Sequence, residues 1–161
     1  MPVKVIYLKS VEKHPYKDEL KRKLEQALQY FPELDDEEIY IGILSEKDPA
    51  AGKADGINRI VKFAVDRPPT FVTIFHELMH LTIHKRKENG EKLPGTEEFC
   101  SIAAMARMPP ELIDEDRIPY VGCFRSRESV PELCRSALEY RKIRRNYIQF
   151  LRKRLGGLNE P

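Results

Sequence analysis

The sequence of 161 residues contains no tryptophan, only three cysteines and no long apolar run. Cys100, Cys123 and Cys134 are odd in number and form no CxxC pair, which argues against a disulfide scaffold and against a cysteine-built zinc finger. No apolar run approaches the roughly 20 residues that cross a membrane. The N-terminus also lacks the basic start and apolar stretch of a secretory signal. We therefore expect a soluble, cytoplasmic protein.

Charged residues are abundant but nearly balanced, since 28 Lys or Arg accompany 26 Asp or Glu for a net charge of +2. The balance is uneven along the chain, because residues 131–161 carry a net charge of +5 and leave −3 for residues 1–130. The length suits one domain with an added element, and 41% hydrophobic residues suffice for a buried core. We expect one domain over residues 1–130 and a basic C-terminal helix over residues 131–161.

The hydrophobic pattern predicts strands followed by helices. Runs of β-branched and alternating residues are typical of strands, and apolar residues spaced three or four apart are typical of helices. Strands are expected at 3–8, 39–44 and 57–65, and helices at 16–30, 70–87, 96–109 and 129–156. The turn signals near residues 48–52 and the prolines and glycines of residues 110–130 predict loops. This order indicates an α+β fold rather than a wound parallel sheet.

The informative motif is HExxH, which comprises His76, Glu77 and His80. Residues i and i+4 lie one turn apart on the same helix face, so both imidazoles can reach one zinc ion. Glu77 can then take a proton from a water molecule that the zinc has acidified. With four His and 18 Glu in the chain, the pattern arises by chance in roughly one such sequence per hundred. We predict that His76 and His80 bind zinc and that Glu77 is the general base and acid.

A zinc hydrolase also needs a third protein ligand and an open fourth position. The longer motif HExxHxxGxxH is absent, because Ile83 and Arg86 occupy the two positions that it requires. Glu97 and Glu98 begin the next predicted helix. Small residues follow Glu97 along its helix face, including Ser101, which could hydrogen-bond a ligating histidine, whereas a bulkier face follows Glu98. We favour Glu97 as the third ligand and keep Glu98 as the alternative.

Segments 76–84 (HELMHLTIH) and 97–104 (EEFCSIAA), followed by Met108-Pro109, resemble the ImmA/IrrE family of gluzincin metallopeptidases. That family has HELGHxxxH and then an acid-rich helix, and the minigluzincins have a similar small architecture. The resemblance implies a zinc cofactor and a protein or peptide substrate. It also implies a small zincin-like α+β domain, in which about three strands pack on the HExxH helix and a glutamate helix.

The sequence departs from the family pattern at two places. Met79 stands where the family has Gly, and Cys100 or Ser101 stands where it has Asn or Asp. The alignment is also ambiguous by one residue. Anchoring it on the Met-Pro pair makes Glu98 the nearest acid, whereas anchoring it on an ExxAD-like pattern makes Glu97 the ligand. The resemblance therefore supports zinc and leaves the third ligand open.

Other residues have weaker assignments. Tyr120 could donate a hydrogen bond to the tetrahedral oxyanion, as a Tyr or His does in gluzincins, or could simply be a packed loop residue. Cys123 could block the zinc as a thiolate, although a small buried thiol is the default. His84 lies too far along the helix to share the ion, so we expect a polar contact at the helix end. Strand 59–65 is expected to be an edge strand that pairs with an extended peptide substrate.

The last predicted helix combines an apolar stripe with many basic residues. We expect the stripe to pack on its own domain or on a second copy of the chain, and binding of nucleic acid by the basic face is less favoured. The chain is therefore predicted to be a zinc metallopeptidase. The alternative is a regulatory or nucleic-acid-binding protein in which the zincin domain is structural or inactive.

Overall fold

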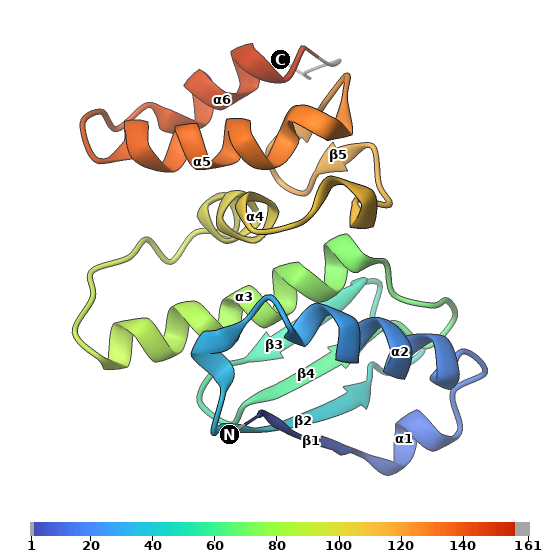
Figure 1. Ribbon diagram of the computed structural model, residues 1–161. Coiled ribbons are helices and arrows are strands. Elements are labelled where there is room, and N and C mark those ends of the chain that lie inside the picture. The colour runs from blue at the N-terminus through green and yellow to red at the C-terminus, as the bar shows by residue number, and fades with distance from the viewer. Residues whose placement is uncertain (1, 157–161) are drawn as a thin grey trace. The chain divides into compact units, whose positions relative to one another are not determined.

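The computed structural model describes residues 2–156 of the chain (Figure 1). The chain divides into two compact units, residues 1–93 (unit 1) and residues 94–161 (unit 2). The described residues contain six α-helices, a four-stranded mixed sheet and a small hairpin, so the predicted α+β class is confirmed. None of the described helices is long and apolar enough to span a membrane. The sequence predicts a division of the chain at residue 130, where the net charge changes from negative to positive, and this division stays a prediction.

The sheet of unit 1 has four strands, one more than the sequence predicts. They are β1 (Lys4–Tyr7), β2 (Glu38–Ile43), β3 (Gly52–Asp55) and β4 (Ile60–Phe63). Their order is β1-β2-β4-β3, in which β2 pairs parallel with β1 and with β4, and β3 pairs antiparallel with β4. The prediction that segment 59–65 is an edge strand is wrong, because β4 lies between β2 and β3. Among the described strands, β3 forms that edge.

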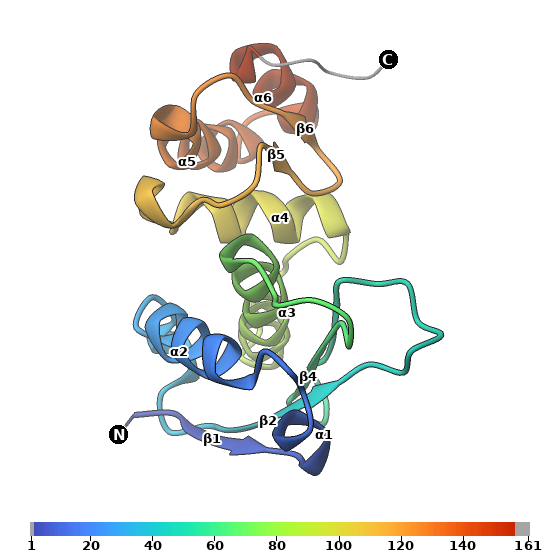
Figure 2. The same cartoon turned by 90° about the vertical axis from the view of Figure 1, so that its right-hand side faces the viewer.

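Three helices complete unit 1: α1 (Lys9–Glu12), α2 (Lys17–Leu28) and α3 (Phe71–Glu88). The apolar stripe predicted for residues 16–30 is buried along α2, whereas α1 was not predicted because it is a single short turn. Figure 1 and the rotated view in Figure 2 show α2 and α3 covering the same face of the sheet. Between them lies an aromatic core, in which the rings of Phe31 and Phe75 are 5.3 Å apart.

Helix α3 begins and ends where the sequence predicts. The Thr70 side chain caps its first turn by accepting a hydrogen bond from the Thr73 N–H at 3.0 Å. Its C-cap is Asn89, followed by Gly90 with a positive φ of 95° that suits glycine. Basic residues in the last turn complement the helix dipole. Local chemistry thus determines both ends of the helix that carries HExxH.

Unit 2 begins with α4 (Glu97–Ala106), whose N-cap Thr96 accepts from the Phe99 N–H at 3.2 Å. The segment predicted as a loop contains the short hairpin of β5 (Arg117–Ile118) and β6 (Gly122–Cys123). Two helices follow, α5 (Val130–Arg141) and α6 (Tyr147–Leu155), and α5 packs on both α4 and α6. The C-terminal segment therefore packs within unit 2.

The prediction of one continuous helix over residues 129–156 is wrong, because the chain turns between α5 and α6. Four of the five residues from Arg141 to Arg145 are basic, and their mutual repulsion disfavours a continuous helix there. The turn lets α6 fold back on α5, which stacks the rings of Tyr140 and Phe150 at 4.1 Å with 11° between their planes. The predicted helix end at Gly156-Gly157 falls partly outside the described residues, since only Gly156 is described.

Candidate metal centre

The two motif histidines lie on consecutive turns of α3 and face each other. Their rings are 4.8 Å apart and nearly perpendicular, and the Nε2 atoms of His76 and His80 are separated by 3.2 Å. His76 is buried and His80 is half-buried. The i, i+4 spacing that the sequence predicts therefore brings both nitrogen atoms to one point beside the helix.

This separation fits a shared metal ion. Two nitrogen atoms bound to one tetrahedral zinc at about 2.0–2.1 Å lie roughly 3.3 Å apart, because the bond angle is near the tetrahedral value. The observed distance of 3.2 Å between the Nε2 atoms agrees with that value. Imidazole nitrogen is also among the donors that zinc prefers. The pair could therefore hold a metal ion without a change in helix geometry.

Glu77, the third motif residue, is buried among apolar neighbours of α3, with only 6% of its surface exposed. Its side chain lies against the edge strand, where a Cβ atom built on Gly52 would be 3.0 Å from both Cγ and Oε2 of Glu77. The same atom would be 3.1 Å from Cγ2 of Thr73. The backbone of β3 thus approaches the carboxylate as closely as a residue without a side chain allows.

The sequence did not identify Gly52 as part of this site, because Ala51-Gly52 is typical of a turn. A glycine inside a strand often marks a close approach of the backbone to another group. That signal was present, but it could be interpreted only once β3 was known to be a strand beside α3.

The two candidate acids occupy the first turn of α4, as predicted. Both are half-buried. Burial raises the pKa of Tyr147 of α6, and the charge of Glu98 makes only a small contribution to that shift. This contribution does not distinguish the two acids, so the preference for Glu97 stays a prediction.

The remaining predicted site residues, apart from His84, lie in unit 2. Cys100 and Ser101 are buried in α4, and Cys123 is half-buried in β6. Tyr120 occupies the turn of the β5–β6 hairpin with a positive φ of 67° and a side chain that is 57% exposed. Its proposed role at the oxyanion stays a prediction.

His84 makes a polar contact one turn beyond the pair, as predicted. Its Nε2 atom lies 3.8 Å from Oε1 of Glu88. Its ring also packs on the turn that follows β3, where a Cβ atom on Gly56 would be only 2.7 Å from Cβ and Cγ of His84. His84 therefore fixes the far end of β3 against α3 and is not needed as a metal ligand.

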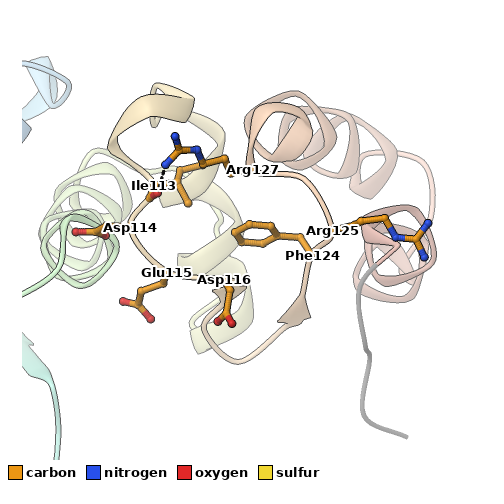
Figure 3. Close-up of a pocket in the computed structure, with 7 residues that line it drawn as sticks. All are labelled: Ile113, Asp114, Glu115, Asp116, Phe124, Arg125 and Arg127. Carbon is orange, nitrogen blue, oxygen red and sulfur yellow. Dashed lines mark hydrogen bonds between the residues drawn. The ribbon is translucent and has the colours of Figure 1, made fainter.

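A separate hollow of about 660 Å³ lies in unit 2, and the ring of Phe124 points toward its middle (Figure 3). Its other lining residues are Ile113, Asp114, Glu115, Asp116, Arg125 and Arg127. The charged groups do not converge, since Asp114 and Arg125 point to opposite sides in Figure 3. Arg127 donates a hydrogen bond to the Ile113 carbonyl at 3.4 Å. We assign no ligand to this hollow.

Comparisons of the chain with protein-family models, with curated proteins and with solved structures find no match. The resemblance of its motifs to gluzincins therefore stays a prediction, and the assignment of function depends on the residues themselves.

Proposed function

We propose that the chain is a zinc-dependent metallopeptidase of the gluzincin type. The observation that carries the proposal is the arrangement of α3, where two imidazole Nε2 atoms lie 3.2 Å apart and a buried carboxylate stands between them in the sequence. The two rings are within hydrogen-bonding distance of each other, and the same separation suits two ligands of one metal ion.

The third ligand is proposed to come from α4. Glu97 is preferred because small residues follow it along its face of α4, and Glu98 remains the alternative. Cys100 is a further donor on the same helix, since thiolate sulfur is a common zinc ligand. Each choice leaves a fourth position for water or substrate.

Bound zinc would polarise the scissile carbonyl and lower the pKa of water. The carboxylate of Glu77 is then the proton carrier, which accepts a proton from the attacking water and passes it to the leaving amine. Its burial keeps bulk water from competing for that proton. Tyr120 is the proposed donor to the oxyanion, as the family resemblance implies.

The substrate is proposed to be a protein or peptide that binds in extended form along β3. An edge strand offers unpaired N–H and C=O groups, and an added strand satisfies them. The start of β3 is also the point at which the backbone touches Glu77. A peptide paired with β3 would therefore pass close to the proton carrier. Peptide binding is thus proposed for β3 in place of its neighbour β4, which is not an edge strand.

Metal analysis of the purified protein tests the first part of this proposal. The wild type is expected to hold close to one zinc ion per chain and His80→Ala none. The matched control is His84→Ala, which removes an imidazole one turn further along α3 and is expected to keep the metal. A zinc-free wild type after zinc loading, or equal loss in the two variants, would contradict the proposal.

The second part is tested by Glu77→Gln, which keeps the size of the side chain and removes its ability to carry a proton. We expect zinc to be retained and peptide hydrolysis to fall by about 10²–10⁴-fold. A peptide library with a fluorescent readout avoids the need to know the natural substrate. Hydrolysis at the wild-type rate in this variant would rule out the role of Glu77.

A further inference from the structure

The turn between α5 and α6 concentrates positive charge at one end of the two helices. This basic turn, residues 141–146 with the sequence RKIRRN, contains four basic residues and no acid. All of it is exposed except Arg141, which is half-buried. Residues 130–156 as a whole carry eight Lys or Arg and two Glu, a net charge of +6. Charge of this density attracts polyanions.

Part of this charge stabilises unit 2. Arg135 donates to the Ala106 carbonyl at 2.8 Å, and Arg152 donates to the Val121 carbonyl at 2.7 Å. Arg141 lies over the ring of Phe99 at 5.0 Å. These three guanidinium groups hold the helices and the hairpin of their own unit together, so they are not available to a ligand.

The cations at the tip of the basic turn have no such role. The side chains of Arg144 and Arg145 are exposed and form no hydrogen bond or ion pair with the described part of the chain. Lys142 pairs only with Glu139, three residues earlier, at 3.1 Å. A guanidinium group matches the geometry of a phosphate with two parallel hydrogen bonds. Two adjacent guanidinium groups that pair with none of the residues 2–156 are therefore suited to neighbouring phosphates.

A stack of aromatic rings begins where the basic turn begins. Arg154 covers one face of Phe150 at 3.8 Å, and Tyr140 stacks on that ring at 4.1 Å. No ring or cation of the described residues covers the other face of Tyr140, which is half-buried. The backbone joins the two features directly, since the N–H of Arg144 donates to the Tyr140 carbonyl at 2.9 Å.

We propose that this end of unit 2 binds single-stranded nucleic acid, with phosphates on Arg144 and Arg145 and a base stacked on Tyr140. An unpaired strand offers both groups, whereas a duplex keeps its bases stacked inside. A phospholipid surface offers phosphate as well, but the basic turn presents only one exposed apolar side chain, Ile143, which is little area for insertion. The proposed binding does not depend on zinc.

The test measures binding of a fluorescein-labelled mixed-sequence strand of about 20 nucleotides to the full chain by anisotropy. Losing two phosphate contacts is expected to lower the slope of log K against log salt by about 1.4 in Arg144→Ala/Arg145→Ala. The matched control is Lys13→Ala/Arg22→Ala, which removes two exposed charges from unit 1 and is expected to keep the wild-type slope. Tyr140→Leu is expected to weaken binding about tenfold without changing the slope.

Three outcomes would overturn the proposal. One is the absence of binding at about 50 mM salt, and another is an equal loss in the two double variants. The third is tight binding to vesicles of anionic phospholipid that is lost in Ile143→Ser while the strand does not bind. Circular dichroism of each variant shows whether it is folded, and the exposed arginine pair gives a valid test even if Tyr140→Leu does not fold.

Discussion

The two units use different basic residues. Unit 1 has twelve Lys and four Arg, whereas unit 2 has two Lys and ten Arg. In unit 1 lysines form ion pairs such as Lys53 with Asp48 at 2.6 Å, and Lys23 and Lys85 also donate to backbone carbonyls. In unit 2 the arginines bind backbone carbonyls and aromatic rings, as Arg152 and Arg141 do. Both units therefore use basic residues for directed contacts, and the contrast lies in which residue makes them, lysine in unit 1 and arginine in unit 2.

The site residues follow the same division. In α3 they are placed by helix geometry alone, since His76 and His80 are separated by one turn of the same helix. In α4 the two candidate acids stand together in the first turn, and helix geometry alone does not decide between them. The following experiments test whether the histidines of α3 and the acids of α4 have the roles that these positions predict.

The largest effect is expected from the third ligand. Glu97→Gln should lower zinc affinity by more than about 100-fold, because loss of a group that only supports a ligand already costs 10–100-fold. Glu98→Gln in the same turn is the matched control and should bind zinc nearly as the wild type does. Competition with a chelator of known affinity measures both. The reverse order of the two variants would make Glu98 the ligand, and no effect in either would favour Cys100.

A smaller effect is expected at Gly52. A Cβ atom there would lie 3.0 Å from Oε2 of Glu77 and would displace the carboxylate. Gly52→Ala should therefore lower kcat for peptide hydrolysis by between about 10- and 100-fold, since small misplacements of a reacting group have effects of this size. Zinc content should not change. Lys53→Ala, on the exposed side of the same strand, is the control and should keep its kcat.

The two N-cap threonines give a matched pair, one in each unit. Thr70→Ala and Thr96→Ala each remove one hydrogen bond to a backbone N–H in a first turn. Each should lower the free energy of unfolding by about 1 kcal/mol. Urea denaturation measures this value, and the Thr→Ser variants should retain most of the stability. A loss of 3 kcal/mol or more at either position would show that the threonine does more than cap its helix.

The smallest effect is expected from Tyr7→Phe. The Tyr7 hydroxyl is buried and has no hydrogen-bond partner within the described residues, so its removal should raise the free energy of unfolding by at most about 1 kcal/mol. Burial raises the pKa of Tyr7 from 10.0 to about 12, with a smaller contribution from the charge of Glu25. Its neutral form is thus favoured in the folded state, and wild-type stability should fall between pH 10 and pH 12 as the unfolded chain ionises first.

The alkaline loss of stability should be smaller in Tyr7→Phe than in the wild type. Tyr40→Phe is the control for the gain in stability, because the Tyr40 hydroxyl donates a hydrogen bond to Glu38 at 2.5 Å and its removal should give no gain. That hydrogen bond also raises the pKa of Tyr40, so Tyr40→Phe should share part of the reduced alkaline loss. Thermal unfolding at pH 8, 10 and 11 compares the three proteins. An equal alkaline loss in all three would show that Tyr7 is not responsible.

The sequence predicted most closely those features that neighbouring residues determine. Both capped helices, α3 and α4, begin at the predicted threonines, and the position of the histidine pair follows from HExxH. Strand β3 was missed because Gly52–Asp55 has little strand propensity. Its strand conformation comes from pairing with β4 and from packing on α3.

The break between α5 and α6 was missed for a related reason. Tyr140 and Tyr147 are seven residues apart, so the apolar spacing continues across the turn as if the helix did. Periodicity does not report that the chain reverses between them. The stack of Tyr140 on Phe150 depends on that reversal, and no pattern in the sequence indicates it.

Gly52 at the start of β3 and Gly56 just after it limit which substitutions this strand tolerates. Gly52 is closed to larger residues by Glu77, and Gly56 is closed by His84. Between them, Lys53 and Asp55 are exposed. Selection for folded, active protein from a saturation library over residues 52–56 would therefore recover glycine at positions 52 and 56. Many different residues would be recovered at the exposed positions 53 and 55. Substitutions at the exposed positions can therefore change the side chains that β3 presents, while the distance between the β3 backbone and Glu77 stays the same.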